Sequence, residues 1–249
     1  MLTARDRLVV ALDFEDLPAA LALVDRLGDE VLWYKVGLEL FAAAGPEAVR
    51  SLAAAGRRVF LDLKFHDIPN TVARATLRGA ELGASLINIH VAAGADALAA
   101  ARRALDERGG EARPKLLGVT VLTSARSLEA AGGESGALDE ASLAQEVGRR
   151  ARIAADAGLD GVVCPVPAAA AVRRACGPSF LLLTPGIRPE GSARGDQRWI
   201  ATPRTALRNG SRWLVVGRPI TAAPDPLAAT RAILEEIDRA AGEAASTGA

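Results

Sequence analysis

Two acids and a lysine stand close together in the stretch VFLDLKFHDIPNT (59–71). Asp62 and Lys64 are two positions apart, and Asp67 follows three positions later. The apolar first half of the stretch predicts a buried strand. Because strand side chains alternate between two faces, Asp62 and Lys64 share one face and their leucine neighbours take the other. The pattern places an ammonium group between carboxylates at the end of a buried strand.

The choice of lysine at these positions is informative. Of the 30 basic residues in the chain, only three are lysines, at positions 35, 64 and 115. Arginine keeps its proton near neutral pH, whereas lysine can release it. A lysine in a chain that otherwise uses arginine therefore indicates a place where proton transfer matters, and we single out Lys35 and Lys64. Drift in a biased composition is the alternative explanation.

The elements that position these residues recur along the whole chain. Short apolar runs, rich in β-branched residues, predict strands at 7–13, 33–38, 58–64, 86–90, 116–122, 161–164, 180–187 and 213–220. Alanine-rich segments with helical spacing lie between them; one opens with Asp16 before Pro18 and ends at Gly28. This alternation predicts one domain over residues 1–249, a closed (β/α)8 TIM barrel, with a frayed tail from about residue 242 to residue 249. A doubly wound open sheet is the alternative.

Composition argues against several other classes. Half of the residues are hydrophobic but only 4% are aromatic, so aliphatic side chains must build the core. With 30 basic and 30 acidic residues the net charge is zero, and nothing indicates a nucleic-acid or membrane surface. The sequence shows no signal-peptide pattern and no apolar run of about 18 residues, so we expect a cytoplasmic protein. Cys164 and Cys176 lack the spacing of metal ligands, and we expect free thiols.

On a barrel, the charged residues form a row across neighbouring strands. Asp13 ends the first predicted strand and Lys35 lies in the second, next to Asp62 and Lys64 in the third, with Asp67 just beyond. A structural network of ion pairs is the alternative. Burying several charges is unfavourable unless they are paired or used, and these lie at the end of the barrel where enzymes of this fold work. We therefore favour a catalytic role.

The seventh and eighth predicted strands end differently. The strings TPGIRP and VVGRPI supply Gly186 with Arg188 and Gly217 with Arg218. Glycine lets backbone N–H groups approach a ligand, and arginine offers a fork of donors suited to phosphate. Loops after these two strands are the common phosphate site of TIM barrels, so we predict one here.

Two loops after strands are rich in glycine and charge, at 125–141 and 188–198. We expect the loop 188–198 to be a lid because it adjoins the predicted phosphate site. An ordinary solvated loop is the alternative.

Taken together, the motifs resemble a known family. The strings VALD, KVG, FLDLKFHDIPNT, VTVLTS, TPGIRP, GDQR and VVGRPI occur in order from residue 10 to residue 220 and resemble orotidine 5′-phosphate decarboxylases. No motif position departs from the family pattern. The resemblance implies a homodimer of TIM barrels that converts orotidine 5′-monophosphate to UMP, the last step of de novo UMP synthesis, without cofactor or metal.

The resemblance also implies roles for single residues. Lys64 would donate the proton to C6 of the pyrimidine, with Asp62 beside the substrate carboxylate. Lys35 would hold the charged row and contact the ribose, which Asp13 also binds, and Asp67 would reach into the partner subunit's site. The remaining implied substrate-binding positions are Ile68 and Thr71 at the dimer interface, Thr123 and Ser124 beside the pyrimidine, Pro185, and Arg188, Gln197, Gly217 and Arg218 at the phosphate.

Two other functions remain open from the residues alone. A metal-dependent sugar-phosphate epimerase or lyase on the same barrel could use His66, His90, Asp62 and Asp67 as ligands. With two histidines in the chain such a site would be poorly supplied, and we expect His90 to be a packed strand-end residue and His66 to point away from the site. A barrel that binds nucleotides without catalysis would leave the acid–lysine row without a purpose.

Overall fold

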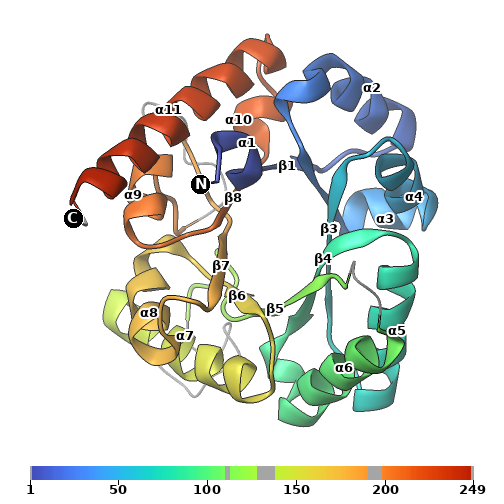
Figure 1. The fold of residues 1–249 in the computed structure, drawn as a ribbon, viewed down its shortest axis with the longest axis vertical. Helices are drawn as coiled ribbons and strands as arrows, with labels where there is room; N and C mark the ends of the chain where they lie inside the picture. The colour runs from blue at the N-terminus through green and yellow to red at the C-terminus, as the bar shows by residue number, and fades with distance from the viewer. Residues whose placement is uncertain (1, 110–112, 128–137, 190–197, 248–249) are drawn as a thin grey trace.

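The computed structural model describes residues 2–109, 113–127, 138–189 and 198–247. Within these residues eight parallel strands pair in chain order, and the last returns to the first, so the sheet is a closed barrel (Figure 1). The strands are β1 Leu8–Leu12, β2 Trp33–Gly37, β3 Arg58–Phe65, β4 Ala84–His90, β5 Lys115–Val119, β6 Gly161–Val163, β7 Leu181–Thr184 and β8 Trp213–Val216. The predicted TIM barrel is confirmed, and the open sheet is wrong.

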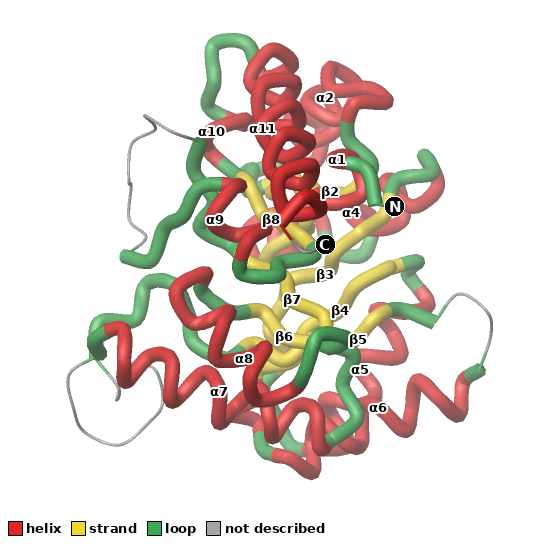
Figure 2. Tube along the Cα trace, turned by 60° about the vertical axis from the view of Figure 1, so that its left-hand side comes forward, coloured by secondary structure: helices red, strands yellow, loops and turns green. Residues whose placement is uncertain are grey.

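Helices surround the barrel on the outside, as the red and yellow segments of Figure 2 show. The α-helices are α1 Ala4–Arg7, α2 Leu17–Leu27, α3 Leu38–Ala44, α4 Glu47–Ala54, α5 Pro69–Glu81, α6 Ala95–Arg108, α7 Glu140–Asp156, α8 Ala169–Cys176, α9 Pro203–Arg208, α10 Arg218–Thr221 and α11 Pro226–Thr247. Short 3-10 turns are η1 Gly28–Glu30, η2 Val91–Ala93 and η3 Val166–Ala168. The predicted start of α2 is confirmed, because the Asp16 side chain accepts the Ala19 N–H at 2.8 Å.

Three predicted strands extend too far at their carboxyl ends. We expected strands to residues 122, 187 and 220, but β5 ends at Val119, β7 at Thr184 and β8 at Val216. Pro185 follows β7, and Gly186 has a φ of +82°, which breaks an extended backbone. After β8 the chain turns at Gly217 into α10. These breaks place the predicted phosphate residues at the mouth of the barrel.

The core has two layers, one inside the barrel and one between the barrel and its helices. The inner layer holds Val9, Ala11, Trp33, Phe60, Leu86, Leu117, Val119, Val163, Leu183, Trp213 and Val215. Trp33 and Trp213 begin their strands and meet edge to face, with ring centroids 5.6 Å apart. Aromatic and aliphatic side chains thus fill the interior below the carboxyl ends, where the charged row begins.

The C-terminal helix α11 extends to Thr247. This does not test the predicted fraying of the tail from about residue 242 to residue 249, which stays a prediction. The sequence here is rich in alanine, which favours helix, and Glu243 lies 2.8 Å from Arg204 of α9 in an ion pair. This local preference and the contact with α9 favour the helix.

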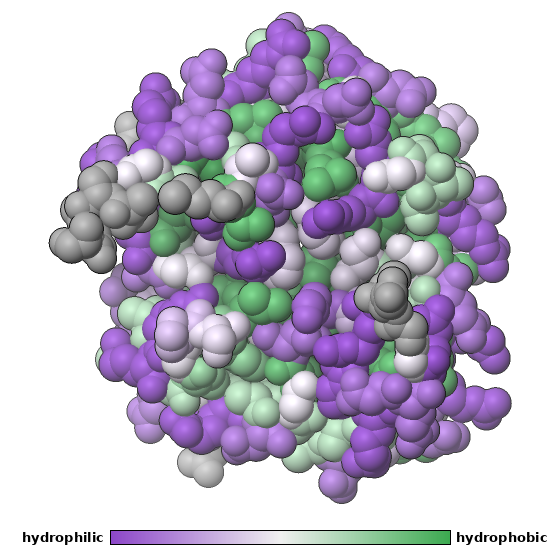
Figure 3. Space-filling view, viewed as in Figure 1, coloured by the Kyte–Doolittle hydropathy of each residue, from purple (hydrophilic) through white to green (hydrophobic). Residues whose placement is uncertain are grey.

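The surface and the cysteines agree with the composition. On the face shown in Figure 3, hydrophilic side chains follow the outline of the molecule and divide the hydrophobic ones into small patches. Among the helices described, none is long and apolar enough to cross a membrane. Cys164 and Cys176 are free thiols, as predicted.

Candidate active site

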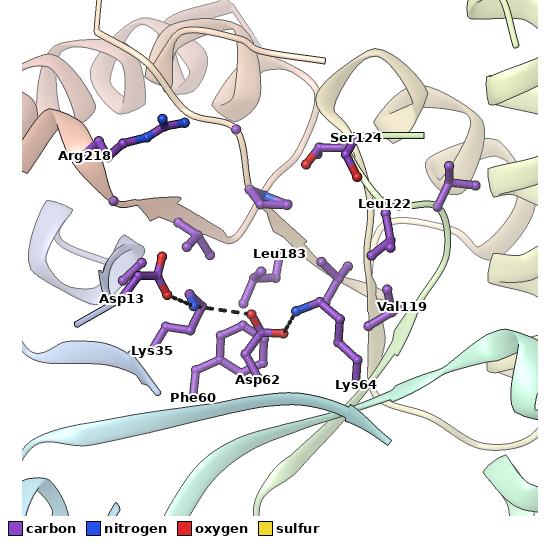
Figure 4. A pocket seen from close by; sticks show the side chains of 18 of the residues that line it. Asp13, Lys35, Phe60, Asp62, Lys64, Val119, Leu122, Ser124, Leu183 and Arg218 are labelled. Carbon is purple, nitrogen blue, oxygen red and sulfur yellow. Dashed lines mark hydrogen bonds and ion pairs between the residues drawn. The ribbon is translucent and has the colours of Figure 1, made fainter. Parts of the chain in front are cut away.

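The carboxyl ends of the strands surround a cavity of about 440 Å³ (Figure 4). Of the residues singled out from the sequence, those lining it are Asp13, Lys35, Asp62, Lys64, Thr123, Ser124, Pro185, Gly186, Arg188, Gly217 and Arg218. Residues from β2 and β3 and from the segments that follow β1, β5, β7 and β8 therefore meet in one place. The cavity also has an apolar lining that sequence reasoning did not name, including Phe60, Val119 and Leu183.

The charged row is continuous. Lys35 Nζ lies 2.8 Å from Asp13 Oδ1 and 3.5 Å from Asp62 Oδ2, and Lys64 Nζ lies 2.8 Å from Asp62 Oδ1. The dashed lines in Figure 4 join Asp13, Lys35 and Asp62, and then Asp62 and Lys64. One carboxylate, that of Asp62, thus bridges the two lysines, and the predicted order of the row is present in the structure.

Lys35 is the most deeply placed cation of the row, with 8% of its surface exposed. Burial acts to lower the pKa of Lys35, but the carboxylates of Asp62 and Asp13 outweigh it and raise that pKa above its ordinary value. Lys35 therefore stays charged at neutral pH. Gly37 makes room for this pair, because a Cβ there would lie 2.6 Å from Lys35 Nζ and 3.2 Å from Asp13 Oδ1.

The backbone at Lys64 is unusual. Lys64 has a φ of +50°, and among the residues described it is the only non-glycine residue with a positive φ. Such a conformation costs about 1–3 kcal/mol for a residue with a side chain. It occurs where the pairing of β3 with β4 is interrupted, between Leu61 and Phe65. The surroundings must stabilise this irregular backbone, which aims the lysine into the cavity together with Asp62.

Arginines supply the positive charge near β7 and β8. Arg188 is 7% exposed, and its Nη1 donates to the carbonyl of Ile187 at 3.0 Å. The Arg188 N–H also donates to the carbonyl of Ala201 at 2.9 Å, which ties the two ends of the segment after β7 together. Arg218 begins α10, and Figure 4 shows it well apart from Lys64 across the cavity. The cavity is therefore cationic at one end and holds an acid–lysine pair at the other.

Some predicted residues do not line the cavity in this single chain. Asp67, Ile68 and Thr71 are exposed, and the Asp67 carboxylate accepts the Ile68 N–H at 2.6 Å. Gln197, and with it most of the predicted lid 188–198, lies outside the described residues. Their proposed roles are therefore not tested by the geometry of the cavity.

The two histidines stack on each other outside the cavity lining, with ring centroids 5.4 Å apart. His90 ends β4, as expected of a packed strand-end residue. Burial, with a smaller contribution from His66, lowers the pKa of His90 to about 4, so its ring is neutral at pH 7. Within the described residues no three His, Cys, Asp or Glu side chains are grouped as a metal site.

A closed (β/α)8 barrel with a charged cavity at the carboxyl ends of its strands defines a TIM-barrel enzyme acting on a small anionic ligand. Comparison with known proteins narrows this class. The sequence profile described as "Orotidine 5'-phosphate decarboxylase / HUMPS family" matches residues 6–233, and the chain belongs to this family.

Similar proteins agree over nearly the whole length. The chain is 51% identical to an "Orotidine 5'-phosphate decarboxylase" of Moorella thermoacetica, over 94% of this chain and 93% of that protein. It is 47% identical to a protein of the same name from Nitrosococcus oceani, over 94% and 98%. A crystal structure of orotidine 5'-phosphate decarboxylase from Lactobacillus acidophilus is similar with a TM-score of 0.80 at 36% identity, covering 94% of this chain and 99% of that one.

Proposed function

We propose that this protein decarboxylates orotidine 5′-monophosphate to UMP, the last step of de novo UMP synthesis. The observation that carries the proposal is the ion pair of Asp62 and Lys64 in the cavity of a chain that belongs to this family, with Lys64 Nζ 2.8 Å from Asp62 Oδ1. The free thiols of Cys164 and Cys176 fit a cytoplasmic enzyme, because a reducing compartment maintains thiols in this form.

The reaction needs a fixed positive charge near C6 of the pyrimidine. When the bond from C6 to the carboxylate breaks, CO₂ leaves and the electron pair stays on C6, where the ring π-system does not delocalise it. The Lys64 ammonium stabilises this developing charge and then gives C6 a proton, which leaves a neutral amine that regains a proton from solvent. Asp62 beside the substrate carboxylate disfavours the bound ground state.

The other residues would bind the rest of the substrate. Lys35 and Asp13 would contact the ribose, and Thr123 and Ser124 the pyrimidine. The positions assigned to the phosphate are Arg188, Gln197, Gly217 and Arg218, and Pro185 is a further substrate-binding position. The phosphate lies away from C6, and its contacts form before the bond from C6 to the carboxylate breaks. Their binding energy would therefore hold the pyrimidine in place.

The proposal includes a homodimer in which Asp67 completes the partner's site, with Ile68 and Thr71 at the interface. Its support in the single chain is that Asp67 and its neighbour Ile68 point to solvent, and that Ile68 is 66% exposed although it is a large hydrophobic residue. A second subunit would cover such a side chain.

Loss of the orotidine monophosphate absorbance is the direct test of the function. We expect turnover that is unchanged after exhaustive treatment with EDTA, because the mechanism uses only the charges of the chain. Turnover of orotidine monophosphate that disappears with EDTA and returns with added Mg²⁺ or Zn²⁺ would overturn the metal-free mechanism, whereas no turnover at all would leave the metal-dependent epimerase or lyase as the alternative. Tight binding of UMP without any turnover would indicate a nucleotide-binding barrel.

Arg218→Ala is expected to act through the phosphate. Loss of a charge-assisted contact of this kind costs about 2–4 kcal/mol, so kcat/KM for the phosphorylated substrate should fall by roughly 30- to 1000-fold. Orotidine without its phosphate should hardly respond to the change. Equal damage to both substrates would place Arg218 outside the phosphate site.

A further inference from the structure

A buried amide lies behind the acid–lysine pair. Asn88, in the middle of β4, has 0% of its surface exposed and does not line the cavity. Its neighbours Ile87 and Ile89 pack in the outer core, whereas Leu86 packs inside the barrel. Alternation along the strand therefore turns the Asn88 side chain inward, toward the charged row.

The amide contacts both members of the pair. Asn88 Nδ2 donates to Asp62 Oδ1 at 2.6 Å, and Asn88 Oδ1 accepts the backbone N–H of Lys64 at 2.8 Å. The partners fix which end of the amide faces which group, because a backbone N–H only donates and a carboxylate only accepts. One side chain thus connects the carboxylate of Asp62 to the backbone of Lys64.

The interrupted pairing of β3 and β4 explains why a side chain is needed there. Leu61 pairs with Ile87 and Phe65 with Ile89, so β3 advances four residues while β4 advances two. Asn88 lies opposite this bulge, where regular backbone pairing fails. Its carbonyl oxygen accepts the N–H of Lys64, the residue with positive φ, and so supports the irregular backbone.

We propose that Asn88 is a positioning residue for decarboxylation. Asn88 fixes where the Asp62 carboxylate and the Lys64 ammonium lie relative to each other and to the substrate, although it does not touch the substrate itself. An asparagine suits both contacts, since aspartate would lack the donor to Asp62 and leucine would lack both groups. The inference rests on the proposed function, because it assigns Asn88 a part in that reaction.

Two variants separate the contacts. Asn88→Leu removes both at similar volume, whereas Asn88→Asp keeps an acceptor for the Lys64 N–H and sets a second carboxylate against Asp62. Because small misplacements at a reacting centre reduce rates by about 100-fold, we expect kcat to fall by about that factor or more in both variants. KM should stay close to wild type, since the phosphate-binding arginines are unchanged.

Thr120→Val is the matched control for a lost buried hydrogen bond. Thr120 is also 0% exposed and does not line the cavity, and its Oγ1 donates to the carbonyl of Val163 at 2.8 Å. We expect this variant to lose stability but to keep a kcat near wild type. If Thr120→Val lost as much kcat as Asn88→Leu, general loosening of the barrel would explain the effect and the proposal would be wrong. Wild-type kcat in Asn88→Leu would also overturn it.

Hydrogen exchange at the Lys64 amide provides a readout that does not depend on activity. Exchange should be faster in Asn88→Leu, which has no acceptor, and near wild type in Asn88→Asp, which keeps one. Equal exchange in all three proteins would show that Asn88 does not hold this amide. If the wild-type protein failed to turn over orotidine monophosphate, the proposed function would fall, while the exchange rates would still decide whether Asn88 supports Lys64.

Discussion

Replacing Lys64 by arginine is expected to stop turnover of orotidine monophosphate as completely as replacing it by alanine. Arginine keeps the positive charge and can still pair with Asp62, but it does not release a proton near neutral pH. Proton transfer contributes about 10²- to 10⁴-fold to such reactions, and the bulkier guanidinium would also displace the charge from C6. We therefore expect kcat to fall by at least about 10⁴-fold in both variants.

Lys115→Arg is the control for this substitution. Lys115 begins β5, at the opposite end of the barrel from the cavity, and its Nζ lies 3.1 Å from Asp160 Oδ1. An arginine can maintain that ion pair, so turnover should stay near wild type. A Lys64→Arg enzyme that kept more than about a tenth of wild-type kcat would contradict proton donation by Lys64, because general acid catalysis is worth more than this factor.

The sequence was sufficient for the fold because each strand is a short apolar run and each connection a helical one. The errors lie at the ends of elements. β7 and β8 end at Thr184 and Val216, where proline and glycine break the extended backbone. An apolar pattern does not reveal these breaks.

The sequence identifies the charged residues of the site, but it does not show the contacts that connect them. Alternation along the strand was enough to place Asp62 and Lys64 on one face of β3. The bulge in β3, the positive φ of Lys64 and the bridge through Asn88 depend on the register between two strands, which local patterns do not encode. In the sequence, the only sign of this bridge is an asparagine at an inward position of the apolar run LINIH. Its partners follow from the register between β3 and β4.

Mixing two inactive proteins is expected to restore activity if Asp67 works in the partner's site. In the described single chain Asp67 is exposed, does not line the cavity and makes no salt bridge with Lys64. In a two-fold dimer each site would take Lys64 from one chain and Asp67 from the other. After subunit exchange between Lys64→Ala and Asp67→Asn, about half of the dimers are mixed, and one of their two sites is intact. Activity should therefore rise from background to roughly a quarter of wild type per total site.

A second pair of variants makes this result specific. Lys64 Nζ lies 2.8 Å from Asp62 Oδ1 of the same chain, so the two residues belong to the same site in any arrangement of the dimer. Mixing Asp62→Asn with Lys64→Ala should leave every site with one defect, and activity should stay at background after the same exchange. Exchange itself is measured with differently tagged subunits, because a negative result has meaning only when mixed dimers are present. If mixed dimers form and both mixtures remain inactive, Asp67 does not act across the interface. If both mixtures recover activity, the recovery does not depend on which chain supplies Asp67. The assignment of Asp67 to the partner's site then loses its support.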